Sequence, residues 1–225
     1  MSNVSGANAA EWTDATLRHL LTADRLGSYL RACDEDLSRA LRLYEWNMSA
    51  GSAVIATTGT VEVIVRNALD RQLVSWAERK GRGDWLGTVP LDQRGRDDVA
   101  KARSRATMRG RRVEQHGRVV AELSFGFWRY LMSQRYHASL WVPSLHKAFP
   151  GATEDLRTRR REVESRLVNL MLVRNRAAHH EPIHRRDLLA DLEDAVELVG
   201  WVHPEAGAWV GAISSLRQVA NARPD

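Results

Sequence analysis

The feature that most constrains the fold is a long helical pattern that stops at a proline. Apolar residues recur at helical spacings from about Thr153 through Leu167 to Val173. Pro182 disfavours helical backbone geometry at Glu181, so the helix has to end near that residue. Similar spacings fill residues 12–44 and most later segments, and they predict an all-α fold.

The last turns of this helix carry a dense group of polar side chains, Arg174-Asn175-Arg176-Ala177-Ala178-His179-His180. The partial negative charge at a helix C-terminus favours imidazolium, which suits groups that exchange protons near neutral pH. Asn175 and His179 share a face, whereas Arg174 and His179 diverge by roughly 140° on an ideal helix. Arg174 and His179 would therefore meet one substrate only if the helix end distorts or a second subunit closes the site, which argues for a homodimer.

This segment resembles the Arg-(four to six residues)-His motif of the HEPN superfamily of helical ribonucleases and RNA-binding proteins. Residues 174–183 look specifically like the Abi-like (abortive infection) bacterial branch. Two further segments match that branch, Glu62-Val63-Ile64-Val65-Arg66-Asn67 and Glu122-Leu123-Ser124-Phe125-Gly126-Phe127-Trp128. The resemblance implies a HEPN-like helical bundle with additional peripheral helices, a dimer, and a metal-independent endoribonuclease acting as a toxin or antiphage effector.

The resemblance also implies roles for individual residues. The catalytic residues would be Arg174, Asn175 and His179, with Glu62, Arg66, Asn67 and His180 in support. His179 would transfer a proton while Arg174 steadies the phosphate charge, and the substrate's own 2′-hydroxyl would be the nucleophile. Asn175 would bind the phosphate or orient His179. Glu62 and Arg66 also have the spacing of an ordinary intrahelical ion pair, and His180 either caps the helix or serves the other subunit.

Two segments are rich in basic residues. Residues 94–112 are either a solvated helix face with a loop at Gly110 or an RNA-backbone track. The track would consist of Arg103, Arg105, Arg109 and Arg112, with Arg176 nearer the motif. The second cluster is diluted by acids, and we expect a solvated face there; it comprises Arg157, Arg159, Arg160 and Arg161.

Composition limits the remaining chemistry. The net charge of +5 comes almost wholly from arginine, which suits phosphate and makes RNA a reasonable partner. Cys33 is the only cysteine, so an intrachain disulfide and a cysteine-based zinc cluster are excluded. His179, His180 and His184 are interrupted by Pro182, and we expect neither a metal nor a cofactor, since no phosphate-loop or dinucleotide motif is present.

The lack of a leader-like segment and the interruption of the longest apolar stretch, residues 52–65, by Glu62 predict a cytoplasmic protein that does not contact a membrane. We expect residues 1–10 to be disordered and residues 11–225 to form a single all-helical domain.

The same patterns predict individual elements. Residues 53–80 are expected to form one helix despite their strand-forming composition. Trp85 and Leu86 are expected to pack on the core. Further helices are expected at residues 92–108, from Ser124, from Asp187, and from Pro204 through Leu216. Residues 141–149 are expected to be irregular, and Gly126 is expected to permit close helix approach.

Three hypotheses follow. The chain is an RNA-cleaving effector, an RNA-binding module without useful turnover, or a helical protein-interaction domain. An antitoxin protein or a regulatory RNA would be a further partner of the first. Loss of His179 should abolish cleavage in the first case, weaken binding modestly in the second and mainly alter stability in the third.

Overall fold

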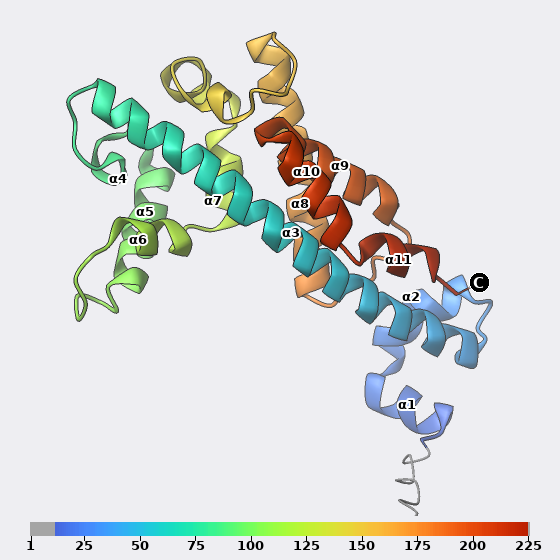
Figure 1. Cartoon of the computed structure of the whole chain (residues 1–225). Helices are drawn as coiled ribbons and strands as arrows, with labels where there is room; N and C mark the ends of the chain where they lie inside the picture. The colour runs from blue at the N-terminus through green and yellow to red at the C-terminus, as the bar shows by residue number, and fades with distance from the viewer. Residues whose placement is uncertain (1–11, 225) are drawn as a thin grey trace, which may run out of the picture.

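A computed structural model describes residues 12–224, which contain helices and no strand, so the predicted all-α fold class is confirmed (Figure 1). The expected disordered segment, residues 1–10, lies outside this range. The α-helices are α1 Asp14–Leu21, α2 Ala23–Ala32, α3 Leu37–Arg79, α4 Trp85–Thr88, α5 Gln93–Ala106, α6 His116–Glu122, α7 Phe125–Leu131, α8 Leu156–Ala178, α9 Leu188–Val202, α10 Pro204–Ile213 and α11 Leu216–Asn221. Short turns η1 Gln134–Tyr136, η2 His137–Trp141 and η3 Leu145–Ala148 form the irregular connection before α8.

The helix α3 is the spine of the molecule (Figure 1). It begins after the N-cap Asp36 and runs unbroken for 43 residues, so the expected separate helix beginning near Ala53 was wrong at its start. The threonines in its middle do not interrupt it, because the hydroxyls of Thr57 and Thr58 donate to carbonyls one turn back, at 2.9 and 2.7 Å. Burial of apolar side chains outweighs the strand propensity of this segment.

Two hydrophobic clusters lie along α3. The first surrounds its second half and includes α4 to α7, the η turns and the middle of α8. The second surrounds its first half and includes α2, the end of α8 and the start of α9. In Figure 1, α4 to α6 therefore lie at one end of α3 and α1 and α2 at the other, while α8 crosses its middle. The α3, α8 and α9 helices contribute to both clusters.

By length and apolar composition α3 is also the one helix within residues 12–224 that could cross a membrane. A buried core helix has the same character, and α3 packs on α2, α8, α9 and α11. Its length and composition are therefore only weak evidence for a membrane span.

Most other helices begin where local capping predicts. At the start of α5, α7, α8 and α9, a side-chain oxygen of the N-cap residue accepts a hydrogen bond from a backbone N–H group of the first turn. These N-cap residues are Asp92, Ser124, Asp155 and Asp187, in that order. Trp85 and Leu86 are buried as expected. The last predicted helix was too long: α10 ends at Ile213, and Ser214 is extended and caps the N–H of Leu216 in α11.

The close helix approach is not at Gly126, where an added Cβ would make only ordinary contacts. It lies at Gly207, where a Cβ would stand 2.9 Å from the carbonyl oxygen of Val196. The pair α9 and α10 therefore depends on a glycine that the sequence pattern did not single out.

The expected solvated face at the start of α8 was wrong for two arginines. Arg159 and Arg160 are buried, because they donate to carbonyls of the irregular segments around them. Arg159 bonds the carbonyls of Thr153 and Ala152 at 2.6 and 3.1 Å, and Arg160 bonds that of Met132 at 2.6 Å. The guanidinium groups thus supply hydrogen-bond donors to backbone carbonyls that lie outside the helices and have no helical N–H partner.

His116, at the start of α6, contacts two carboxylates. Its Nε2 lies 2.9 Å from Asp70 on α3, and its Nδ1 lies 3.1 Å from Asp84, the N-cap of α4. The indole of Trp85 also donates to Asp70 at 2.7 Å. This cluster ties α6 to α3 and α4.

Asp92 joins α5 to α7 and η1. Its carboxylate accepts hydrogen bonds from the hydroxyls of Tyr130 and Tyr136 at 2.7 and 2.9 Å and from the N–H of Gly95 at 2.9 Å. Arg135 pairs with it at 2.8 Å. Burial alone would raise the pKa of the Asp92 carboxyl, but the hydrogen bonds and the nearby guanidinium outweigh burial and lower that pKa to about 2.

We predict that Asp92→Asn lowers the free energy of unfolding at neutral pH by about 1–2 kcal/mol, because the hydrogen bonds from Tyr130 and Tyr136 and the pair with Arg135 lose the carboxylate charge. The folded-state pKa lies below the ordinary 3.8, so this stabilisation is present above pH 3.8 and is lost as pH falls toward 2. Denaturant unfolding should therefore show the deficit shrinking over that interval. Asp98→Asn, on the same helix, should show neither effect.

Candidate functional site

The polar motif lies where α8 ends. Helical hydrogen bonding continues to His179, whose N–H donates to the carbonyl of Asn175 at 3.0 Å. His180 then has a left-handed backbone with φ of 55°. Its N–H donates to the carbonyl of Ala177 at 3.0 Å, and the N–H of Glu181 donates to that of Arg176 at 2.8 Å. These two bonds define a Schellman cap with His180 at the position usually taken by glycine.

A buried amide that the sequence analysis missed fixes the segment after this cap. Asn47, on α3, is 2% exposed. Its Oδ1 accepts the N–H of Ile183 at 2.7 Å, and its Nδ2 donates to the carbonyl of Glu181 at 3.5 Å. An asparagine inside an apolar helical stretch is disfavoured unless its side chain has such a task, and that is the sequence signal that could have revealed it.

His184 anchors the same segment from the other side. It is 1% exposed, and its Nε2 lies 2.8 Å from the hydroxyl of Ser28 on α2. Burial lowers the pKa of His184, and the positive charges of Arg185 and Arg223 lower it further. His184 therefore does not join His179 and His180, and no group of three metal-ligating side chains is found within residues 12–224.

The helix α3 packs on α8, and the positive charge of Arg174 on α8 acts on the carboxyl of Glu62 on α3. Burial raises the pKa of Glu62, although the positive charges of Arg174 and Arg66 oppose that shift. Glu62 forms a direct salt bridge with neither arginine within the described residues, so the expected ion pair with Arg66 is absent there. The Nε of Arg66 is buried without a hydrogen-bond partner in that range. Glu62 and Arg66 thus do not neutralise each other through a direct salt bridge.

The motif side chains differ in how available they are. Arg174 and His179 are exposed, and Asn175 is partly buried and accepts a hydrogen bond from Arg174 at 3.2 Å. Arg176 pairs with Glu181 at 3.4 Å, so its charge is partly neutralised. Because α8 stays regular up to His179, the directions of Arg174 and His179 still differ by roughly 140°. One chain therefore does not place both on one face.

The third matched segment, residues 122–128, packs against α8 close to the motif. Phe125, Phe127 and Trp128 are buried on α7, so these aromatic rings pack in the core and are not exposed for base stacking. A Cβ at Gly126 would lie 3.9 Å from the sulfur of Met171, three residues before Arg174. The matched segments of α3, α7 and α8 therefore come together in space. Asn67, the last residue of the α3 segment, is exposed.

No family model, curated protein or solved structure matches this chain. The HEPN resemblance therefore rests on the three sequence segments. Their assembly around α8 is compatible with it, and the fold established by the structure is all-α.

The basic segment does not form a uniform track. Arg103 pairs with Glu114 at 3.2 Å, and Arg105 pairs with Glu122 at 2.9 Å. Arg109 and Arg112 are exposed on the turn between α5 and α6. Two of the four predicted RNA-binding arginines thus hold local structure.

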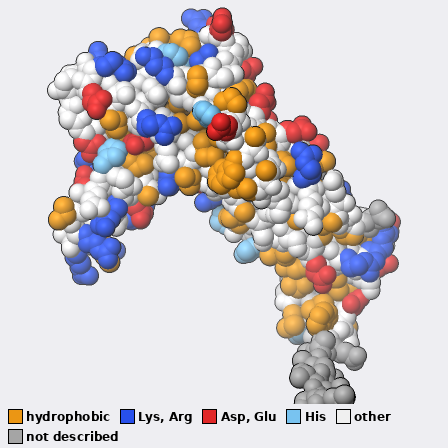
Figure 2. Space-filling model, in the orientation of Figure 1, with side chains coloured by type: hydrophobic (Ala, Val, Ile, Leu, Met, Phe, Trp, Pro, Cys, Tyr) orange, Lys and Arg blue, Asp and Glu red, His pale blue; other side chains and the backbone are white. Residues whose placement is uncertain are grey.

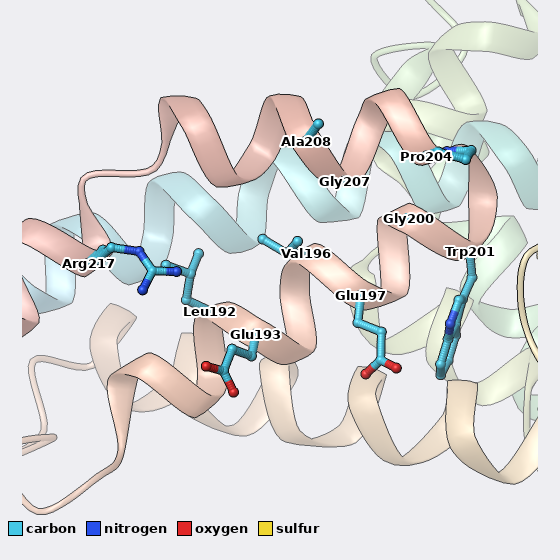
Figure 3. A pocket seen from close by; sticks show the side chains of 10 residues that line it. All are labelled: Leu192, Glu193, Val196, Glu197, Gly200, Trp201, Pro204, Gly207, Ala208 and Arg217. Atoms are coloured by element: carbon cyan, nitrogen blue, oxygen red, sulfur yellow. The ribbon is translucent and has the colours of Figure 1, made fainter.

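A cavity of about 570 Å³ lies away from the motif between α9 and α10 (Figure 3). Its walls are mainly apolar, with Glu193 and Glu197 on α9 and Arg217 at the α11 end. Glu197 already pairs with Arg166 of α8. No predicted site residue lines this cavity, so it takes no part in chemistry at the motif.

We predict that His180→Gly raises the free energy of unfolding by about 0.5–1 kcal/mol, because glycine adopts the left-handed cap without a steric cost. Ala178→Gly, two residues earlier in the helix, should instead lower it by about 0.5–1 kcal/mol. Urea unfolding of the native protein and of both variants measures these two changes in the free energy of unfolding. Destabilisation by His180→Gly would mean that the imidazole makes a stabilising interaction that outweighs the backbone strain.

Proposed function

We propose that the chain is a metal-independent endoribonuclease of the HEPN type, acting in the cytoplasm as a toxin or antiphage effector. The observation that carries this proposal is the packing of the three matched segments on α3, α7 and α8, with the charge of Arg174 on α8 acting on the carboxyl of Glu62 on α3. His179 lies one turn further along α8 and is exposed to a substrate. RNA is the substrate, and an antitoxin protein or regulatory RNA would control the activity.

The proposed reaction uses the RNA's own 2′-hydroxyl. His179 removes its proton as the 2′-oxygen attacks the adjacent phosphorus, and the bond to the 5′-oxygen breaks. The leaving oxygen takes a proton from an imidazolium or from water, which gives a 2′,3′-cyclic phosphate and a 5′-hydroxyl. Arg174 stabilises the charge that builds on the non-bridging oxygens, and Asn175 binds the phosphate or orients His179.

The active form is proposed to be a homodimer. Within one chain Arg174 and His179 point in different directions, yet both are exposed near the same helix end. A two-fold partner would bring Arg174 of one copy to His179 of the other and build two equivalent sites. Glu62, Arg66, Asn67 and His180 would then position these groups.

A second candidate is an RNA-binding module without turnover. It is favoured by the hydrogen bond from Arg174 to Asn175, and by the absence of any contact between Arg174 and His179 within the described chain. The two candidates differ in what His179 does, and its replacement separates them.

We predict that His179→Ala lowers RNA cleavage by about 10²- to 10⁴-fold, because general acid–base catalysis is lost, while circular dichroism shows an unchanged fold. His19→Ala, which removes an exposed histidine on α1, should leave cleavage intact. Product analysis should find the cyclic phosphate, a single 2′-deoxy substitution at the scissile position should block cleavage, and a chelator should have no effect. Activity that a chelator abolishes, or that survives in His179→Ala, contradicts this mechanism.

We further predict that light scattering shows a dimer and that mixed inactive variants complement each other. If each site takes Arg174 from one copy and His179 from the other, exchange between Arg174→Ala and His179→Ala protomers should recover about a quarter of the native activity, because half the dimers then contain one intact site. As the control, each variant is carried alone through the same exchange procedure and should stay inactive. A monomer, or mixtures that stay inactive after exchange, would show that the site does not combine two copies.

A further inference from the structure

The turn between α5 and α6 has an unusual backbone. Met108, Arg109 and Gly110 all have positive φ, at 49°, 58° and 84°. Glycine adopts this conformation freely, whereas methionine and arginine do so at a steric cost. Consecutive strained residues of this kind persist only when the surrounding contacts hold them, and they often mark a functional site.

Local hydrogen bonds hold this turn in place. The N–H groups of Met108 and Arg109 donate to the carbonyls of Arg105 and Ser104 at 3.0 and 2.7 Å. Thr107 then accepts two more, from the N–H of Gly110 at its hydroxyl and from that of Arg112 at its carbonyl, at 3.1 and 2.9 Å. The result is a shallow cavity of about 370 Å³ lined by Ser104, Arg105, Met108, Arg109 and Arg111.

The charge of this cavity is neutralised only in part. Arg103 and Arg105 pair with acids of the following segment, but no acidic partner is found within residues 12–224 for Arg109, Arg111 or Arg112. Figure 2 shows basic side chains gathered at the tip of the lobe that carries α5 and α6. The turn therefore presents guanidinium groups that are free to bind an anion.

We propose that this cavity binds a nucleotide of single-stranded nucleic acid. Guanidinium forks on Arg109 and Arg111 fit phosphate oxygens in two-point hydrogen bonds. Met108, which is 48% exposed, offers an apolar, polarisable face for a base. The volume is within the range of small-molecule sites, and an unstacked base is available only in a single strand.

A membrane surface fits the turn less well. Met108 and Val113 are exposed apolar residues at this turn, at 48% and 82%, but they do not form the apolar helix face with which peripheral proteins enter lipid. The arginines instead line a concave cavity. The identity of the strand as RNA rests on the proposed function, whereas binding of a nucleotide does not.

The test measures binding without cleavage. A labelled 2′-O-methyl RNA of about twelve nucleotides spans a typical single-strand site and cannot supply a 2′-hydroxyl nucleophile. Fluorescence anisotropy should show that Arg109→Asn combined with Arg111→Gln weakens binding by about tenfold or more. It should also reduce the salt slope by roughly 1.4, which is about 0.7 for each phosphate of a single strand that is no longer neutralised. Asparagine tolerates the left-handed backbone, so this variant should fold.

Arg157→Gln combined with Arg161→Gln is the matched control. Both are exposed arginines at the start of α8, so the net charge changes equally, and binding should stay near the native value. Weakening of the same size in the control would reduce the effect to general charge and overturn the proposal.

Met108→Gly tests the base. It relieves the backbone strain, so the thermal midpoint should hold or rise, while affinity for the oligonucleotide falls several-fold. An abasic oligonucleotide of the same length should bind the native protein more weakly than the intact oligonucleotide does. The native protein and Met108→Gly should have the same affinity for the abasic strand. Equal affinity for the abasic strand, preference for a duplex, or binding only to vesicles containing phosphatidylserine would overturn the proposal.

These results separate the proposal from the proposed function. His19→Ala, which lies on α1 outside both proposed sites, should bind the oligonucleotide as the native protein does. Native binding by the Arg109 and Arg111 variant, together with normal cleavage, would overturn the nucleotide site alone. If that variant loses binding and the native protein cleaves no RNA, the nucleotide site is supported and the ribonuclease proposal is rejected.

Discussion

The packing of α8 across the middle of α3 is the interaction on which the candidate site depends. The two helices are close where a Cβ on Gly51 would lie 3.8 Å from that of Ala177, near the end of α8. Asn47 then holds the chain beyond the cap, and the charge of Arg174 acts on the carboxyl of Glu62. Asn47 and Glu62 are about 22 Å apart along α3. One rigid helix therefore positions both sides of the motif.

The sequence predicted those parts of the structure that depend on local chemistry. The effect of Pro182 placed the end of α8, and the polar residue Asp187 placed the start of α9, because each acts within a few residues. The proximity of Glu62 to Arg174 was expected only through the family resemblance. Helical spacing gives the face of a residue on its own helix, but it does not give the partner across the core.

Long-range contacts account for what the sequence analysis missed. The continuity of α3 depends on apolar partners from several helices, and the task of Asn47 depends on a segment more than a hundred residues away. Charge patterns were misleading for the same reason. Arg159 and Arg160 look like surface residues in the sequence, but the carbonyls that they bind belong to segments whose irregular path no periodicity describes. The net charge of +5 thus overstates the charge available to a ligand.

The sharing of α3, α8 and α9 between the two hydrophobic clusters has a consequence for how the molecule comes apart. If the cluster around α2 opens, Val173 and Leu192 lose partners on helices that also carry Leu167 and Leu198 of the other cluster. Neither end can therefore detach as an independent folding unit, and the described helices should unfold cooperatively. The motif lies on α8 next to the point where the two clusters meet, so its geometry is protected by the stability of the whole bundle and not by that of one end.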